Sequence, residues 1–297
     1  MTDIGSFRGS GVALLTPFED DGSLDLESFR ALAEHQIDSG TDYLVPCGST
    51  GEAGTLTSEE QRILIKATVE VSDGRVPVLA GAGALATADA VRLARAAAEE
   101  GADAILAGSP PYSRPPQDGL FSHFRSIAEA VDVPVIVYNV PGRTAVNVLP
   151  ETILRLAGID NVWGVKEASG NLVQISTLIR DRPDDFLVIA GDDELTLPIV
   201  ALGGDGAISV IANQVPRLYG RMVHLALDGK MDEARGLHFR MVDLMRANFV
   251  ETNPVPAKAG MALLGRMSEK VRLPLVSASP EARNAVEKAL DPIRNDE

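Results

Sequence analysis

The chain has 297 residues, a hydrophobic content of 45% and a charged content of 23%, which fits a globular protein with one large α/β domain or two ordinary ones. Its formal net charge of −15, without any basic run, argues against nucleic acid or an anionic membrane as a partner. The single cysteine, Cys47, excludes an intramolecular disulfide and a cysteine-rich metal site. The first residues carry no signal-peptide pattern, and no apolar run approaches the ~18 residues of a transmembrane helix, so we expect a cytoplasmic protein.

Eight short apolar runs rich in Val, Ile, Leu and Ala recur along the chain, each of a length typical of a buried parallel strand. They span residues 9–18, 41–48, 76–83, 102–110, 133–140, 161–169, 186–193 and 206–213. Segments with helical spacing lie between them, at about 25 to 30 residues for each strand and helix together. This alternation predicts an α/β fold, a (β/α)₈ TIM barrel.

Several of the helical segments carry signals for where a helix begins and ends. The clearest segments are residues 23–40, 57–74 and 87–101. The expected starts are Thr57 or Ser58 and Thr87, and the expected stops are Gly40, Gly74 and Gly101.

The last part of the chain contains helical patterns only, more than the single helix that the barrel still needs. We expect residues 1–215 to form the barrel strands and helices. Residues 216–297 should add the final barrel helix and an appended helical bundle, in one continuous unit. A doubly wound sheet is the alternative architecture, but no G-x-G-x-x-G follows a strand, and "GAGALA" at 81–86 lacks the third glycine.

Reactive residues of such barrels lie at the carboxyl ends of strands, which draws attention to Lys166 at the end of the run 161–169. An amine desolvated there would have its pKa lowered from about 10.4 toward neutrality. A neutral amine is a nucleophile for a carbonyl and gives a Schiff base. The alternative is a structural ion pair with Glu167, although the next residue along a strand should point to the opposite face.

Two more strand ends carry polar groups that suit the same chemistry. Tyr138 ends the run before that of Lys166, so a phenol could shuttle protons to the amine, or it could simply pack. Ser49 and Thr50 lie in the glycine-flanked loop "GSTGE", whose hydroxyls and amides suit a small carboxylate. Arg143 could clamp a second carboxylate with its guanidinium, or lie at the surface without a ligand.

Seven motifs together resemble the dihydrodipicolinate synthase family of class I pyruvate-dependent lyases and aldolases. They are "GSTGE" (48–52), "PYSRP" (111–115), "YNVPGRT" (138–144), "GVKEASG" (164–170), "GDD" (191–193), "GAISV" (206–210) and "NPVPAK" (253–258). Their order and spacing match from about residue 7 to 290. The resemblance implies condensation of pyruvate with L-aspartate 4-semialdehyde to 4-hydroxy-tetrahydrodipicolinate, the entry step of diaminopimelate and lysine biosynthesis.

The resemblance also implies the role of each site residue. Lys166 would form the imine with pyruvate, and Tyr138, Ser49 and Tyr112 would form a hydroxyl relay, with Tyr112 reaching in from a neighbouring subunit of a tight dimer. Thr50 and the backbone at Ile208 would hold the pyruvate carboxylate. Arg143 would bind the second substrate, and Gly191 would leave room at the pocket wall. The implied assembly is a homotetramer built as a dimer of dimers, without a metal or cofactor, since pyruvate itself forms the covalent imine.

Two departures from the family pattern keep other activities open. Ser49 stands where the synthases usually have threonine, and "RTA" replaces the more usual "RTG" after Arg143. The first alternative is another pyruvate-dependent lyase or aldolase acting on a sugar acid or keto acid. The second is a catalytically silent barrel that binds keto acids.

Positions that line the lysine feedback pocket of regulated family members predict weak or absent inhibition by lysine. In this chain they are Ala53, Thr57, Glu60, Leu85, Asp89 and Pro111.

Overall fold

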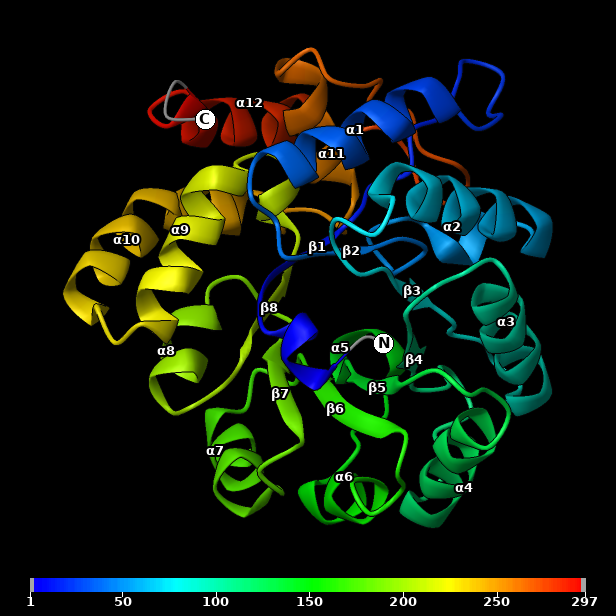
Figure 1. Ribbon diagram of the computed structural model, residues 1–297. Coiled ribbons are helices and arrows are strands. Elements are labelled where there is room, and N and C mark those ends of the chain that lie inside the picture. Colours follow the sequence, from blue (N-terminus) through cyan, green and yellow to red (C-terminus); the bar gives the residue numbers. More distant parts are fainter. Residues whose placement is uncertain (1–2, 295–297) are drawn as a thin grey trace.

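The computed structural model describes residues 3–294 and shows the expected barrel of eight parallel strands inside a ring of helices (Figure 1). The strands are β1 (Gly9–Ala13), β2 (Tyr43–Val45), β3 (Leu79–Gly81), β4 (Ala104–Gly108), β5 (Val135–Asn139), β6 (Val162–Glu167), β7 (Leu187–Ala190) and β8 (Gly206–Ser209). Each lies inside one of the eight predicted apolar runs. The prediction of a (β/α)₈ barrel is confirmed.

The strands follow one another around the barrel in chain order, with β8 beside β1. Between β2 and β3 the ladder is reduced to an isolated parallel bridge of Leu44 with Val78, and the Leu44 amide donates to the carbonyl of Pro77 at 3.0 Å. The ring is therefore nearly closed, which leaves no long exposed strand edge.

Side chains from alternate strand positions fill the barrel interior. Tyr43 is fully buried there, its ring packs edge-on against Phe7 at 5.7 Å, and its hydroxyl donates to the carbonyl of Ala207 at 3.0 Å. These contacts plug the end of the barrel where the strands begin, and η1 (Ile4–Phe7) lies near the barrel axis (Figure 1). Among residues 3–294 that end is packed, so we look for a ligand site at the carboxyl ends of the strands.

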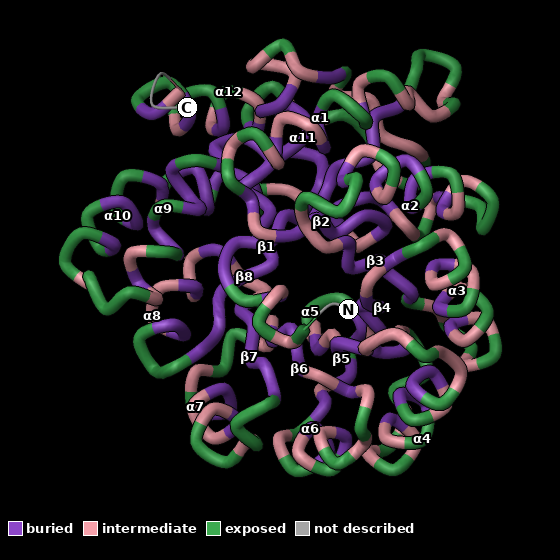
Figure 2. The backbone as a smooth tube through the Cα atoms, in the orientation of Figure 1, coloured by how far each residue is buried: buried purple, intermediate pink, exposed green. Residues whose placement is uncertain are grey.

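Helices cover the outside of the barrel, and their buried faces alternate with exposed ones (Figure 2). They are α1 (Leu26–Asp38), α2 (Ser58–Ser72), α3 (Thr87–Glu99), α4 (Gln117–Ala128), α5 (Pro141–Thr144), α6 (Pro150–Leu156), α7 (Leu172–Asp181), α8 (Thr196–Ala201), α9 (Pro216–Leu227), α10 (Met231–Ala247), α11 (Val255–Leu263) and α12 (Pro280–Leu290). Short 3₁₀ turns form η2 (Ala53–Thr55) and η3 (Ile211–Asn213). The periodicity of the sequence did not separate α5 from the loop after β5.

The predicted helix starts and stops are confirmed. Thr57 caps α2 with a full capping box to Glu60, and Gly40, Gly74 and Gly101 adopt the positive φ expected of helix stops. The helix α3 begins at Thr87, after Ala86, and the Thr87 hydroxyl bonds to His123 Nδ1 at 2.9 Å.

The carboxyl-terminal helices pack as an extension beside the barrel. α9 packs on β1 and on α10, α10 also packs on α12, and α11 packs on α12 and η3. The division of the chain at residue 215 stays a prediction of the sequence.

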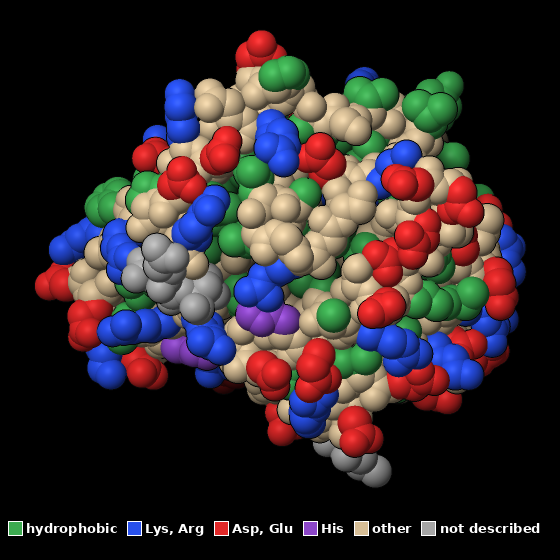
Figure 3. Space-filling view, turned by 90° about the horizontal axis from the view of Figure 1, so that it is seen from above, with side chains coloured by type: hydrophobic (Ala, Val, Ile, Leu, Met, Phe, Trp, Pro, Cys, Tyr) green, Lys and Arg blue, Asp and Glu red, His purple; other side chains and the backbone are tan. Residues whose placement is uncertain are grey.

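Acidic and basic side chains are interspersed on the face seen in Figure 3, with apolar side chains between them. Within residues 3–294, no helix is long and apolar enough to cross a lipid bilayer.

Candidate active site

A pocket of about 120 Å³ lies at the carboxyl ends of the strands. Its lining comes from most of the strand ends and from the segment before α11: Ala13, Val45, Gly48, Ser49, Thr50, Leu106, Tyr138, Val140, Arg143, Lys166, Ala168, Gly191, Asp192, Val210, Phe249 and Asn253. Seven of these residues, among them Ser49, Tyr138 and Arg143, also line an adjoining groove of about 460 Å³. Five of the predicted polar site residues therefore meet in one place.

The strand register brings Lys166 and Tyr138 side by side. In the parallel pairing of β5 with β6, Tyr138 is the direct partner of Lys166, and Asn139 is the partner of Glu167. Side chains of paired residues point to the same face of a sheet, so amine and phenol share the barrel interior. The Lys166 Nζ lies 4.4 Å from the centre of the Tyr138 ring.

Glu167 does not pair with Lys166. Its carboxylate lies on the opposite face of β6, where it accepts hydrogen bonds from Asn139 Nδ2 at 3.1 Å, Gln174 Nε2 at 3.0 Å and the Ser169 amide at 2.7 Å. The structural ion pair considered for Lys166 is thus absent among the described residues.

Burial lowers the pKa of the Lys166 amine, which favours its unprotonated, nucleophilic form. The residue is 6% exposed, and desolvation lowers its pKa from 10.5 to about 7, assisted by the positive charge of Arg143 and opposed by Asp193. Near neutral pH a large fraction of this amine is therefore unprotonated and able to attack a carbonyl.

Burial shifts the pKa of the Tyr138 phenol in the opposite direction, upward. Burial raises its pKa, while Arg143 and a hydrogen bond with Ser49 lower it. Tyr138 therefore stays protonated near neutral pH and is able to donate a proton, with Ser49 as the next hydroxyl of a chain.

Ser49 and Thr50 lie in a tight turn after β2. The amides of Gly51 and Glu52 donate to the carbonyls of Gly48 and Ser49 at 3.1 and 3.2 Å. The Thr50 hydroxyl accepts a hydrogen bond from Asn253 Nδ2 at 2.9 Å, so its own proton remains available for a ligand. The turn can therefore present two hydroxyl donors to a small carboxylate.

Arg143 lies at the mouth of the pocket on α5. Pro141 at the first turn of this helix presets the backbone, and one guanidinium nitrogen donates to the carbonyl of Asn253 at 3.0 Å. The side chain is exposed, so its other donors can meet an incoming anion.

Three predicted site residues lie at the margin of this arrangement or outside it. A Cβ at Gly191 would be 3.0 Å from Lys166 Cε and 2.8 Å from Ala168 Cβ, so any side chain there would crowd the amine. Ile208 packs in the barrel interior, and the pocket wall near it is formed by Val210. Tyr112 is 89% exposed on the loop after β4, where its φ is +75°, and does not line the pocket of its own chain.

Comparison with known proteins identifies the family of the chain. The model of the dihydrodipicolinate synthetase family matches residues 6–293. The chain belongs to this family. A 4-hydroxy-tetrahydrodipicolinate synthase of Koribacter versatilis is 53% identical over 95% of this chain and 94% of its own length, and one of Chlorobium phaeobacteroides is 49% identical over 95% and 96%. The crystal structure of dihydrodipicolinate synthase from Aquifex aeolicus is 42% identical, with a TM-score of 0.94 over 96% of this chain and 98% of that one.

The structure shows how each of the two departures from the family pattern is accommodated. Ser49 keeps the hydroxyl that bonds Tyr138, so the smaller residue preserves the contact. Ala145, where the family more usually has glycine, caps α5 with a φ of +59°, a left-handed conformation that favours glycine.

Two polar residues at the pocket were not singled out from the sequence. Asn253 joins Thr50 to Arg143, and its Oδ1 is buried without a partner in the described residues. Asp193 is buried beside Lys166 and accepts hydrogen bonds from the amides of Val210 and Ile211 at 3.2 and 2.9 Å. Asn253 lies in the motif "NPVPAK" and Asp193 in "GDD". Neither residue ends a strand, so a search of strand ends does not find them.

Within residues 3–294, no group of three or more His, Cys, Asp and Glu side chains is arranged to hold a metal ion.

Proposed function

We propose that this protein condenses pyruvate with L-aspartate 4-semialdehyde to give 4-hydroxy-tetrahydrodipicolinate, the entry step of diaminopimelate and lysine biosynthesis. One observation carries the proposal: a desolvated amine, Lys166, lies against a protonated phenol, Tyr138, in a pocket that ends at a guanidinium, Arg143. The names of its relatives, at 49 to 53% identity, support the same activity.

The first half of the reaction captures pyruvate. Unprotonated Lys166 Nζ attacks the keto carbon, the carbonyl oxygen takes a proton from Tyr138, and loss of water leaves the imine. Thr50 and the turn around Ser49 bind the pyruvate carboxylate. No metal or cofactor is needed, since the imine itself withdraws electrons from the methyl group.

The second half forms the carbon–carbon bond. The Tyr138 phenolate takes a methyl proton of the protonated imine, which gives an enamine, and the enamine carbon attacks the aldehyde while the new alkoxide takes that proton back through the Tyr138 relay. The amino group of the semialdehyde then attacks the imine carbon, which closes the ring and releases Lys166. Gly191 leaves the space in which the substituted amine can turn. Arg143 binds the carboxylate of the second substrate at the pocket mouth.

The exposure of Tyr112 supports an assembled enzyme. A tyrosine that is 89% exposed beside the groove can enter the pocket of a second copy, but not its own. We propose a tight dimer in which Tyr112 completes the partner's hydroxyl relay, within a homotetramer of two such dimers in the cytoplasm.

Replacement of Arg143 by alanine distinguishes this activity from a lyase acting on a polyhydroxy sugar acid. We expect Arg143→Ala to lower kcat/KM for aspartate semialdehyde roughly 100-fold, because a charge-assisted contact with the carboxylate is lost. Pyruvate capture, measured by borohydride trapping at pH 8.5, should stay near the original rate. Arg92→Ala, at an exposed arginine of α3, serves as the control. Full activity of Arg143→Ala with the semialdehyde would contradict the assignment.

The pKa of Lys166 sets the pH dependence of pyruvate capture. Since burial lowers that pKa to about 7, the trapping rate should fall about tenfold for each pH unit below 7 and level off above it. Stopped-time borohydride trapping between pH 5.5 and 10 measures this. A rate that keeps rising to pH 10 would show a lysine with an ordinary pKa.

Lysine should inhibit this protein weakly or not at all. Of the positions that line the feedback pocket in regulated relatives, Pro111 offers no hydrogen-bond donor, Leu85 is 64% exposed, and Glu60 already forms an ion pair with Arg272. Initial rates at millimolar lysine should equal those without it. A micromolar inhibition constant would refute this expectation.

A coupled assay tests the proposed activity as a whole. Pyruvate and aspartate semialdehyde are supplied together with a dihydrodipicolinate reductase, and oxidation of the nicotinamide cofactor is followed. Turnover that requires both substrates is the expected result, and no turnover with active reductase would refute the proposal.

A further inference from the structure

The turn that carries Ser49 and Thr50 lies between two residues in an unfavourable conformation. Cys47 and Glu52 both have positive φ, +57° and +55°, although neither is a glycine. Such conformations persist only where the surroundings hold them. The contacts of Glu52 show what holds this end of the turn.

Glu52 forms an ion pair that is closed to solvent. Its Oε1 lies 2.5 Å from the Nζ of Lys258 on α11, and neither side chain has any exposed surface. Its Oε2 accepts a hydrogen bond from the Arg272 amide at 3.1 Å, and Lys258 also donates to the carbonyl of Lys270 at 2.6 Å. Desolvation lowers the pKa of Lys258 to about 8, while Glu52 opposes that shift.

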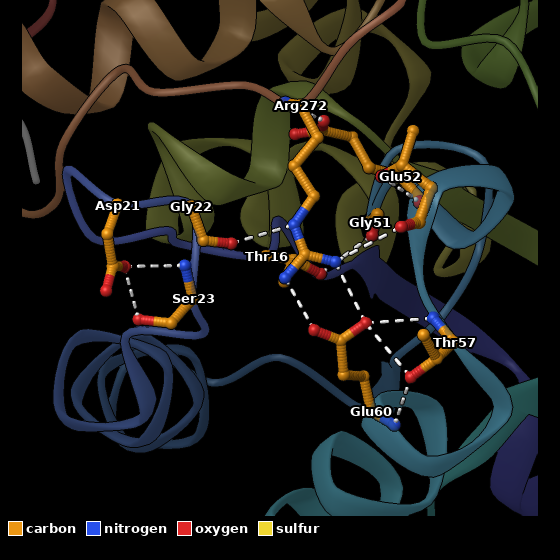
Figure 4. A network of polar contacts seen from close by, with 10 residues as sticks. Thr16, Asp21, Gly22, Ser23, Gly51, Glu52, Thr57, Glu60 and Arg272 are labelled. Carbon is orange, nitrogen blue, oxygen red and sulfur yellow. Dashed lines mark hydrogen bonds and ion pairs between the residues drawn. The ribbon is translucent and has the colours of Figure 1, made fainter.

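Arg272 extends the cluster to two more loops (Figure 4). Its guanidinium donates to both carboxylate oxygens of Glu60, to the carbonyl of Gly22 at 2.9 Å and to that of Thr55 at 3.1 Å. The ring of Phe18 lies 4.3 Å from Lys258 Nζ and 4.4 Å from the Arg272 guanidinium carbon. The connection between α11 and α12 is thereby tied to the loops after β1 and β2.

The same carboxyl-terminal segment holds the turn at a second point. Asn253, which shortly precedes α11, donates to the Thr50 hydroxyl. The turn is thus fixed at Thr50 by Asn253 and at Glu52 by Lys258 and Arg272. A buried ion pair is weak as a source of stability, because apolar residues of similar volume often stabilise a fold as well or better.

We propose that Glu52, Lys258 and Arg272 are positioning residues that set the conformation of the Ser49–Thr50 turn for pyruvate capture. The inference rests on the proposed function. Glu52, Lys258 and Arg272 do not line the pyruvate pocket. Any effect that they have on pyruvate binding must therefore act through the conformation of the turn. Loss of the charges should weaken the grip of Thr50 on the pyruvate carboxylate and displace Ser49 from Tyr138.

The test separates positioning from stability by removing one charge or both. Lys258→Met leaves a buried unpaired carboxylate, so the thermal midpoint should fall and half-saturation by pyruvate in borohydride trapping should rise. The double variant Glu52→Gln/Lys258→Met removes both charges and should recover most of the thermal midpoint. Its half-saturating pyruvate concentration should nevertheless remain at least fivefold above that of the original protein.

A control variant loses a largely buried ion pair far from the pocket. Arg182→Met removes one of the two arginine partners of Asp205, which precedes β8 at the opposite end of the barrel, and should lower the thermal midpoint without changing pyruvate half-saturation. Recovery of both properties in the double variant would show a purely structural pair and overturn the inference.

A further variant decides the matter if the double variant does not fold. Arg272→Met changes a side chain that is 19% exposed, and it should raise the half-saturating concentration about threefold; no change would overturn the inference. If the unaltered protein traps no pyruvate, the proposed function itself fails, which is a different outcome.

Discussion

Lys166→Met should lower kcat/KM for the condensation by roughly 10⁴-fold or more, because the amine that we propose forms the imine is removed. Methionine has a similar length and no charge, so it fits the space between the Tyr138 ring and Gly191. Coupled-assay rates and borohydride trapping measure the loss. Lys66→Met, at an exposed lysine of α2, is the matched control and should retain full activity.

The same substitution should raise stability. The pKa of Lys166 is about 7 in the folded protein and 10.5 in the unfolded chain, so at pH 7 the unfolded chain binds more protons. Burial of this lysine therefore costs stability below pH 10.5, at about 1.4 kcal/mol for each unit of the shift. Lys166→Met should raise the thermal midpoint at pH 7, by an amount that shrinks toward pH 10. An inactive variant with a lowered midpoint would indicate misfolding instead.

Tyr138→Phe is expected to have the second largest effect, a fall in kcat of about 10²- to 10⁴-fold, which is the usual contribution of general acid–base catalysis. The ring remains packed against Lys166 while the hydroxyl that bonds Ser49 is lost. Single-turnover trapping should show slower imine formation, and pyruvate half-saturation should change much less than kcat.

A second buried tyrosine provides the control for Tyr138→Phe. Tyr43→Phe removes a hydroxyl that donates to Ala207 at the packed end of the barrel, so it should lower stability by about 1 kcal/mol and leave kcat unchanged. If Tyr138→Phe kept kcat within threefold, the proton would have to come from another group.

Much of this site follows from strand positions in the sequence. The apolar runs located all eight strands, and in a parallel barrel the residues at consecutive strand ends are neighbours. The pairing of Tyr138 with Lys166 was therefore foreseeable, as was the lowered pKa of an amine that ends a buried strand. Glu167 on the opposite face followed from the period of two residues along a strand.

Contacts between distant parts of the chain were not foreseeable. Asn253 meets Thr50 across 203 residues, and Lys258 on α11 meets Glu52 in the turn after β2, a contact that no periodic pattern of the sequence indicates. The Thr87 hydroxyl, at the start of α3, likewise bonds to His123 on α4, which no local pattern indicates. In each case the partner of a polar group is determined by tertiary packing. Local patterns in a single sequence do not indicate such partners.

The most direct test of the account is reduction of the intact protein with borohydride in the presence of pyruvate, followed by peptide mass spectrometry. We expect the reduced pyruvate adduct on the peptide that contains Lys166, only when pyruvate is present, and none on the peptide that contains the buried Lys258. An unmodified Lys166 peptide, or an adduct carried by another lysine, would contradict the Schiff-base mechanism.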